Sequence, residues 1–210
     1  MKVVIFGASG RTGRELLRQA IDRGHEVTAF VRNPNTFTLT ETKVVLAVGD
    51  VANRTSVDQA IAHQDAVVCA LGAKSLWRRQ PQLTIGMHNI LSSMEQTHVS
   101  RLVYLSADTV HEARQALNPL RRYLLIPVLL HNTAADHELD EAMIQQSHLD
   151  WIIVRPPVLT DGPLTGRYRS GAHLASTTLI PQISRADVAD FMLDQLTNDA
   201  FLHQTPIVAH

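Results

Sequence analysis

The chain of 210 residues contains one cysteine, carries a formal net charge of −1 and has no long apolar run. A single cysteine excludes a framework of internal disulfides and is compatible with a reducing compartment. Cys69 lies in the apolar run AVVCALG, which indicates a thiol packed in a strand rather than a reactive one. The charge balance gives no reason to expect nucleic acid or an anionic membrane as a partner.

The longest apolar run, Tyr123–Leu130, is too short to span a bilayer and contains Pro127. Near the start, Lys2 is followed at once by a short strand pattern and a polar turn, which does not fit a signal peptide. We therefore expect a soluble, cytoplasmic protein with no membrane partner. The sequence leaves monomer and dimer open as oligomeric states.

Lysine is scarce, since Lys2, Lys43 and Lys74 are the only three in the chain. A tyrosine and a lysine spaced Y-x-x-x-K form the proton-transfer pair of many reductases. The positions four before these lysines are absent, Leu39 and Ala70, so that pair is impossible here. The same absence argues against an epimerase of nucleotide sugars, which normally needs both residues.

Short apolar runs alternate with amphipathic stretches along almost the whole chain. Strands are predicted at residues 3–6, 27–32, 43–50, 65–72, 101–107 and 150–157. Helical spacing appears at residues 13–23, 54–63, 84–97, 134–147 and 185–197. This alternation favours right-handed βαβ crossovers and predicts an α/β fold, a doubly wound parallel sheet (Rossmann fold), in one domain spanning residues 1–210. The carboxyl ends of the strands would then meet at one ligand crevice.

Two irregular segments, roughly 109–132 and 157–184, interrupt the alternation. Long loops in compact α/β domains often bind substrate, so we expect both on the substrate side, with surface loops that have no function as the alternative. At the start of the helix after the first segment, Thr133 and Asp136 have the spacing of a capping box.

The stretch GASGRTG contains Gly7, Gly10 and Gly13, between the first predicted strand and the first predicted helix. Glycine lets backbone N–H groups approach an anion, and the N-terminus of a helix adds partial positive charge. The stretch therefore predicts the phosphate-binding turn of a nucleotide site.

The residue at the end of the second strand indicates which dinucleotide is bound. Related folds often place an acid there for the ribose 2′-hydroxyl of NAD(H), or an arginine for the 2′-phosphate of NADP(H). The chain has Arg32 there, and no acid between Glu26 and Glu41. A guanidinium suits phosphate through charge and a two-pronged fork, and Arg11 in the glycine turn could reach the same phosphate. NADP(H) is therefore favoured, with a solvated arginine at a strand end as the alternative.

Further candidates follow the next two strands. Asp50 could accept a hydrogen bond from the adenine amino group while Val51 packs on the ring, although Asp50 could equally be an ordinary turn residue. Leu71, Gly72 and Ala73 include small residues that would let the backbone approach the pyrophosphate and ribose.

Ser106 ends the fifth strand, and His137 lies near the start of the helix before the last long strand. Both are candidate catalytic residues, although His137 could also be a surface histidine at a helix start. Ser106 lacks the G-x-S-x-G context of a hydrolase nucleophile. His131 and His137 lack a compact metal-ligand spacing, so no metal site is predicted.

Taken together, the motifs resemble the atypical short-chain dehydrogenase/reductase group and, most closely, the flavin reductase/biliverdin-IXβ reductase family. The resemblance covers roughly residues 1–200 and rests on GASGRTG, VTAFVRNP, VGDV, RLVYLSA, the ADH of Asp136 and His137, RPP and PLTGRY. It implies that Gly7, Ser9, Gly10, Arg11, Thr12 and Gly13 hold the pyrophosphate. It also implies roles for Arg32 at the 2′-phosphate, Asp50 and Val51 at adenine, Leu71, Gly72 and Ala73 along the nicotinamide half, Ser106 at the substrate, and His137 and Pro157 at the nicotinamide.

The resemblance implies hydride transfer from NADPH to a planar acceptor, such as free flavin, a quinone or a tetrapyrrole, with flavin as substrate rather than bound cofactor. That family works without the Y-x-x-x-K pair. Two departures limit the comparison: Val158 replaces a second active-site histidine of the best-known members, and segment 109–132 is longer and more apolar. The alternative is an NADP(H)-sensing regulator resembling the NmrA-like proteins, in which Tyr123–Leu130 would serve a protein partner.

Overall fold

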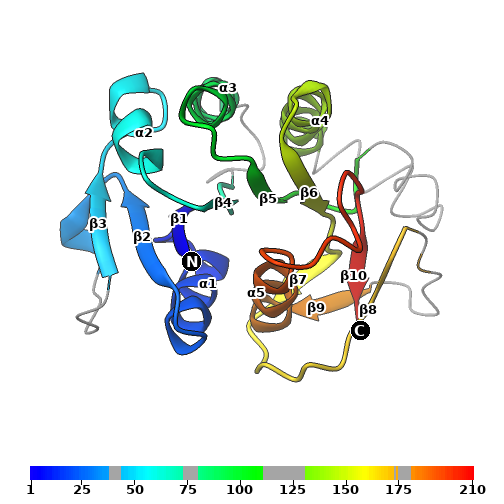
Figure 1. Cartoon of the computed structure of the whole chain (residues 1–210). Coiled ribbons are helices and arrows are strands. Elements are labelled where there is room, and N and C mark those ends of the chain that lie inside the picture. The colour runs from blue at the N-terminus through cyan, green and yellow to red at the C-terminus, as the bar shows by residue number, and fades with distance from the viewer. Residues whose placement is uncertain (38–43, 73–79, 111–130, 173, 175–180) are drawn as a thin grey trace.

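A six-stranded parallel sheet forms the centre of the computed structural model, which describes residues 1–37, 44–72, 80–110, 131–172, 174 and 181–210 (Figure 1). The strand order is β3-β2-β1-β4-β5-β6. The strands are β1 (Lys2–Phe6), β2 (Glu26–Val31), β3 (Val44–Val48), β4 (Ala66–Cys69), β5 (Arg101–Leu105) and β6 (Asp150–Val154). This is the strand order of dinucleotide-binding sheets, so the predicted doubly wound α/β fold is confirmed.

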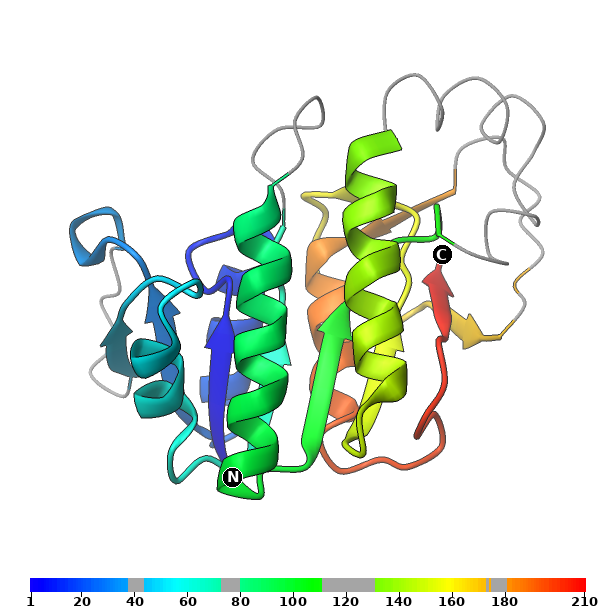
Figure 2. The same cartoon turned by 90° about the horizontal axis from the view of Figure 1, so that it is seen from above.

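Helices cover both faces of the sheet (Figures 1 and 2). One layer contains α1 (Arg11–Asp22) and α5 (Arg185–Asp194), and the other contains α2 (Arg54–Ile61), α3 (Pro81–Thr97) and α4 (His131–Gln146). Strand side chains alternate between the layers, since Val3 and Ile5 pack toward α1 and α5 whereas Val4 and Phe6 pack toward α2, α3 and α4. The chain builds outward from β1 in one direction and from β4 in the other, so the ligand crevice is expected beyond the carboxyl ends of these two strands.

Cys69 lies at the end of β4 and is fully buried. Burial raises the pKa of its thiol to about 12, which keeps the sulfur protonated and unreactive. The thiol is therefore packed in a strand, as its apolar run indicated.

The predicted capping box at Thr133 and Asp136 is wrong. Helix α4 already begins at His131, so Thr133 lies within it. The Asp136 carboxylate instead accepts a hydrogen bond from the backbone N–H of Gln80, at 3.2 Å. A partner distant in sequence has taken the carboxylate, and the contact ties α4 to the residue that precedes α3.

The segment 157–184 is more regular than expected. It contains β7 (Val158–Thr160), paired in parallel with β9 (Gln182–Ser184), and β8 (Arg169–Gly171), paired in antiparallel with β10 (Ile207–Ala209). Most of the other predicted loop, residues 111–130, lies outside the described residues.

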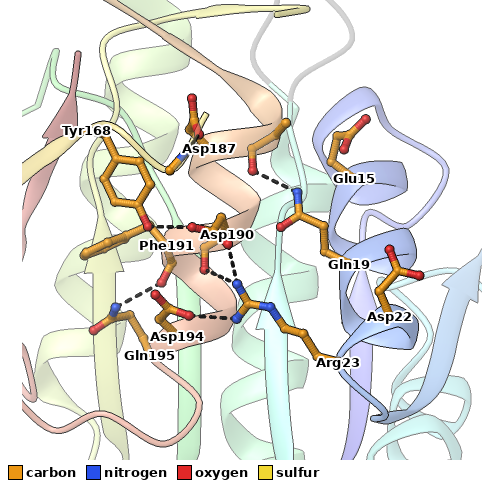
Figure 3. Close-up of polar contacts among 12 residues, drawn as sticks. Glu15, Gln19, Asp22, Arg23, Tyr168, Asp187, Asp190, Phe191, Asp194 and Gln195 are labelled. Carbon is orange, nitrogen blue, oxygen red and sulfur yellow. Dashed lines mark hydrogen bonds and ion pairs between the residues drawn. The ribbon is translucent and has the colours of Figure 1, made fainter. Parts of the chain in front are cut away.

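Polar contacts join α1 to α5 (Figure 3). Arg23, directly after α1, donates to the carboxylates of Asp190 at 2.5 Å and Asp194 at 2.8 Å. The side-chain amide of Gln19 donates to the backbone carbonyl of Ala186 at 2.8 Å. These contacts fix α1, whose first turn carries the predicted phosphate site, against the second helix of its layer.

Candidate functional site

The glycine turn brings β1, β4 and α1 closer together than side chains would allow. Gly7 has φ +82°, and a Cβ atom built on it would lie 2.3 Å from the carbonyl oxygen of Ala70. A Cβ atom on Gly13 would lie 2.1 Å from the carbonyl oxygen of Gly7. Both positions therefore require glycine, which explains two of the three glycines in the motif.

The first turn of α1 offers backbone donors to an anion. Gly10 is the N-cap residue, and no side chain caps the helix. The first N–H groups of a helix have no carbonyl partner within the helix, and the helix dipole favours negative charge at this end. The turn thus has the geometry and electrostatics of a phosphate site.

A first cavity of about 260 Å³ opens beside this turn. Eight of the predicted cofactor residues line it: Gly7, Ser9, Gly10, Arg32, Asp50, Val51, Leu71 and Gly72. The ends of β1, β2, β3 and β4 therefore converge on one space, as the parallel sheet predicts. Ala73 lies outside the described residues.

Three residues define the end of this cavity farthest from α4. Arg32 is exposed and, within the described part of the chain, forms no ion pair. Asp50 is also exposed, and its Oδ1 accepts a hydrogen bond from the backbone N–H of Ala52 at 2.9 Å, so it makes the turn contact that was its alternative role. Val51 is buried against Gly86 of α3, where a Cβ atom would lie 2.6 Å from Val51 Cγ2.

A second cavity, of about 380 Å³, continues from the first. The two share Gly10, Ala70, Leu71 and Gly72 in their walls. Five more of the predicted site residues line this second cavity: Arg11, Thr12, Ser106, His137 and Pro157. Gly13 lies in neither lining and is instead packed against the backbone of the turn.

Arg11 lies at the second cavity, away from Arg32. Its Nη1 donates to Asp161 Oδ2 at 2.9 Å, and the other carboxylate oxygen of Asp161 accepts from Arg185 Nη1 at 2.6 Å. Both arginines line the second cavity. In this arrangement Arg11 is directed toward Asp161, not toward the end of β2.

Ser106 is held by a buried ion pair that the sequence analysis missed. Its hydroxyl donates to Glu141 Oε1 at 2.5 Å, and Glu141 is fully buried. Arg155 binds the same carboxylate through Nη2 at 2.6 Å and Nε at 3.1 Å. Since Arg155 is also buried, the two charges compensate each other and fix the orientation of the serine.

His137 belongs to a second buried network. The Tyr104 hydroxyl lies 2.7 Å from His137 Nδ1 and 3.1 Å from Asp140 Oδ2. Burial raises the pKa of Tyr104 well above its usual range, and the neighbouring Asp140 adds to the effect. Burial lowers the pKa of His137, although Glu141 and Asp136 oppose the shift. Burial raises the pKa of Asp140 to about 7.

Periodicity could have placed the missed residues on common faces of their own elements, although not against one another. Tyr104 and Ser106 are two apart on one strand, so their side chains lie on the same face of the sheet. His137, Asp140 and Glu141 are three and four apart, which places them on one side of α4. Arg155 also follows directly after an apolar strand, where a charge needs a buried partner.

Two further observations concern only the residues that the structure describes. None of their helices has the length and apolar character needed to cross a membrane. Within the same ranges, no group of three or more His, Cys, Asp or Glu side chains is arranged to hold a metal ion.

Comparisons with known proteins agree with this arrangement. Residues 7–199 match a family described as NAD(P)H-binding. The chain is 32% identical over 203 residues to the uncharacterized protein YwnB of Bacillus subtilis, a match that covers 93% of this chain and 92% of YwnB. It is 26% identical over 220 residues to the photosystem II assembly factor Ycf39 of Synechocystis, of which it covers 62%.

Solved structures share the fold. The anaerobilin reductase ChuY of Escherichia coli O157:H7 aligns with a TM-score of 0.83 at 21% identity, over 99% of this chain and 96% of ChuY. A short-chain dehydrogenase/reductase of Veillonella parvula in complex with NADP aligns with a TM-score of 0.81 at 17% identity, over 100% and 94%. Because the family match covers nearly the whole sequence, the chain belongs to the NAD(P)H-binding family.

Proposed function

We propose that the protein is an NADPH-dependent reductase that transfers hydride to a planar acceptor, such as a free flavin, a quinone or a tetrapyrrole. One observation carries the proposal. Two cavities share Gly10, Ala70, Leu71 and Gly72, so an extended dinucleotide can run from the arginine at the end of β2 to the titratable side chains of α4. The NAD(P)H-binding family match supports the first half of this assignment.

The cofactor half rests on the glycine turn and Arg32. A side chain at Gly7 or Gly13 would collide with backbone atoms of Ala70 or of Gly7, so glycine at both positions allows the close-packed turn beside which a pyrophosphate would bind. The exposed guanidinium of Arg32 supplies a bidentate partner for a 2′-phosphate, which favours NADPH over NADH. Asp50 keeps one carboxylate oxygen for the adenine amino group while the other makes its turn contact.

The acceptor half rests on the second cavity. Its volume of about 380 Å³ falls within the range of small-molecule sites, and Leu105, Pro156, Pro157 and Leu159 supply apolar walls. NADPH, when bound, supplies the hydride. The protein contributes a dry cleft that holds the two rings together, with Ser106 orienting the acceptor or the carboxamide and His137 beside the reacting atoms.

Oxidation of NADPH by catalytic amounts of the protein tests this proposal. FMN, a water-soluble quinone and a linear tetrapyrrole would each be supplied in excess, in parallel with NADPH and with NADH. We expect acceptor-dependent oxidation that is faster with NADPH. Tight NADPH binding without turnover on any of the three acceptors would contradict the reductase and favour the NADP(H)-sensing alternative.

A further inference from the structure

The Tyr104 hydroxyl has one proton but faces two hydrogen-bond partners. It lies within hydrogen-bond distance of both His137 Nδ1 and Asp140 Oδ2, at 2.7 and 3.1 Å. The phenol can donate to one of them only, so the other must donate to the phenol oxygen. Several arrangements of protons therefore satisfy the same positions of the heavy atoms, and two of them, both with a neutral His137, differ in a way that matters for proton transfer.

In the first arrangement Asp140 is a carboxylic acid that donates to the Tyr104 oxygen. Tyr104 then donates to Nδ1 of neutral His137, whose own proton is on Nε2. In the second arrangement Asp140 is a carboxylate that accepts from Tyr104, and His137 carries its proton on Nδ1, from which it donates to the phenol oxygen. The two arrangements differ by one proton, which leaves from Nε2.

The location of the three residues gives that proton a destination. His137 lines the second cavity, and Nε2 is the ring nitrogen that Tyr104 does not occupy. Asp140 lies deeper, is buried, and lines a small cavity between α3 and α4 together with His137 and Asp136. The phenol of Tyr104 is fully enclosed between them.

The surroundings of Asp140 favour its acid form. Within the described residues its Oδ1 has no hydrogen-bond partner, which is costly for a buried carboxylate. Negative charge also faces it from its own helix, at Asp136 and at Glu141, which is paired with Arg155. Hydrogen bonding from the Tyr104 and Thr84 side chains opposes these effects and lowers the pKa of Asp140, but burial outweighs it. Cys69 of β4 lies beyond Tyr104. Consistent with this geometry, burial raises the pKa of Asp140 to about 7.

We propose that Asp140, Tyr104 and His137 form a proton relay that delivers one proton to the acceptor as it receives hydride; this rests on the proposed function. His137 releases its Nε2 proton to the acceptor, the phenol proton moves to Nδ1, and the carboxyl proton moves to the phenol oxygen. Bound NADPH would supply two electrons and one hydrogen as hydride, and the relay supplies the second hydrogen as a proton. Asp140 is left as a carboxylate and takes a proton from solvent before the next turnover.

The tautomer of His137 tests the relay without any turnover. Nitrogen-15 NMR of the histidine side chains distinguishes a proton on Nε2 from one on Nδ1, and a His137→Gln variant assigns the signal. On the two sides of the Asp140 pKa, at about pH 5.5 and about pH 8.5, we expect neutral His137 to change from the Nε2–H to the Nδ1–H form. The change should be lost in Asp140→Asn and Tyr104→Phe, and retained in Glu138→Gln, which removes a carboxylate from the same helix.

A tautomer that is the same at both pH values, or a change that persists in Asp140→Asn, would overturn the relay. Kinetics give the second readout. With saturating NADPH and FMN, kcat of Asp140→Asn and Tyr104→Phe should fall by at least about tenfold and lose its decline above about pH 7, while NADPH affinity and the activity of Glu138→Gln stay unchanged. If the unaltered protein reduces no acceptor, the proposed function fails, and the NMR experiment still decides whether the relay exists.

Discussion

At the scale of single residues, we propose that Arg32 sets which dinucleotide the site prefers. We expect Arg32→Ala to weaken NADPH binding by roughly 10- to 100-fold, because charge-assisted hydrogen bonds contribute about 1.5–3 kcal/mol. NADH has no 2′-phosphate, so its affinity should change little. Fluorescence titration with both dinucleotides measures the two dissociation constants, and Arg167→Ala removes an exposed arginine outside the cavity linings as a control. Equal losses for NADPH and NADH would contradict the role of Arg32.

Ser106 lines the second cavity and not the first, so its contribution should fall on the reacting end of the site and not on the adenine half of the dinucleotide. We expect Ser106→Ala to lower acceptor turnover by about tenfold with an NADPH dissociation constant that stays nearly constant. Steady-state kinetics combined with a binding titration separates the two effects. An unchanged turnover number would remove Ser106 from the active site.

The buried Glu141–Arg155 pair is expected to fix the orientation of Ser106. Removing one partner of the pair should also lower the stability of the fold. Arg155→Met leaves a buried carboxylate without its partner, and such losses cost about 3–5 kcal/mol of folding free energy. Urea unfolding should show this loss, and a double variant with Glu141→Leu should recover much of it. If the double variant is no more stable than Arg155→Met alone, the buried pair does not act as a unit.

The convergence of the candidate cofactor residues on one crevice could be predicted from sequence, because each follows directly from a local pattern: a glycine turn, or a residue at the end of an apolar strand. Their binding of a cofactor stays a prediction. Tyr104, Asp140 and Glu141 could not be identified in the same way. Their significance depends on contacts between the β5 end and α4, made by residues 33 to 36 apart in the sequence. No local pattern specifies how these two elements dock. Arg11 shows the same limit, because Asp161, its partner, is distant in the chain.

At the scale of elements, the PLTGRY stretch is anchored to α5. Asp187, in the first turn of α5, accepts hydrogen bonds from the backbone N–H groups of Thr165 and Gly166, both at 2.8 Å. The hydroxyl of Ser184, the N-cap residue, accepts from the Asp187 backbone N–H at 3.0 Å. The PLTGRY stretch therefore has a structural role, because its backbone is bound to α5. The sequence of the stretch alone does not reveal that contact.

Asp187 should make the stability of the fold depend on pH in the acid range. Burial opposes its ionisation, but hydrogen bonds from Thr165, His210, Gly166 and Ser184 outweigh burial and lower the pKa to about 2. The carboxylate thus stabilises the folded state at pH values above 3.8, the pKa of this carboxyl in the unfolded chain. This contribution is lost as the pH falls toward 2. We expect Asp187→Asn to lose about 1–3 kcal/mol at neutral pH and to show a flatter decline of stability between about pH 4 and pH 2. Unfolding curves measured across that pH range check both effects. If the stability of Asp187→Asn declined between about pH 4 and pH 2 as steeply as that of the unaltered protein, the role of Asp187 would be contradicted.

At the scale of the whole molecule, alternation of strands and helices was sufficient to predict the sheet. Consecutive parallel strands with right-handed crossovers leave few arrangements, and the observed order β3-β2-β1-β4-β5-β6 is one of them. The division of the crevice into two joined cavities was not predictable, because it depends on how closely the turn after β1 approaches the end of β4. That approach is set by the contact between Gly7 and Ala70.

We propose that hydride passes directly from NADPH, held along both cavities, to an acceptor in the second. Single-turnover oxidation of NADPH deuterated at one or the other C4 position tests this most directly. A fixed site presents one face of the nicotinamide to the acceptor. We therefore predict that acceptor-dependent oxidation is slower with deuterium at one C4 position and unchanged with deuterium at the other. Equal rates for both labelled forms and unlabelled NADPH, or the absence of acceptor-dependent oxidation, would contradict the account.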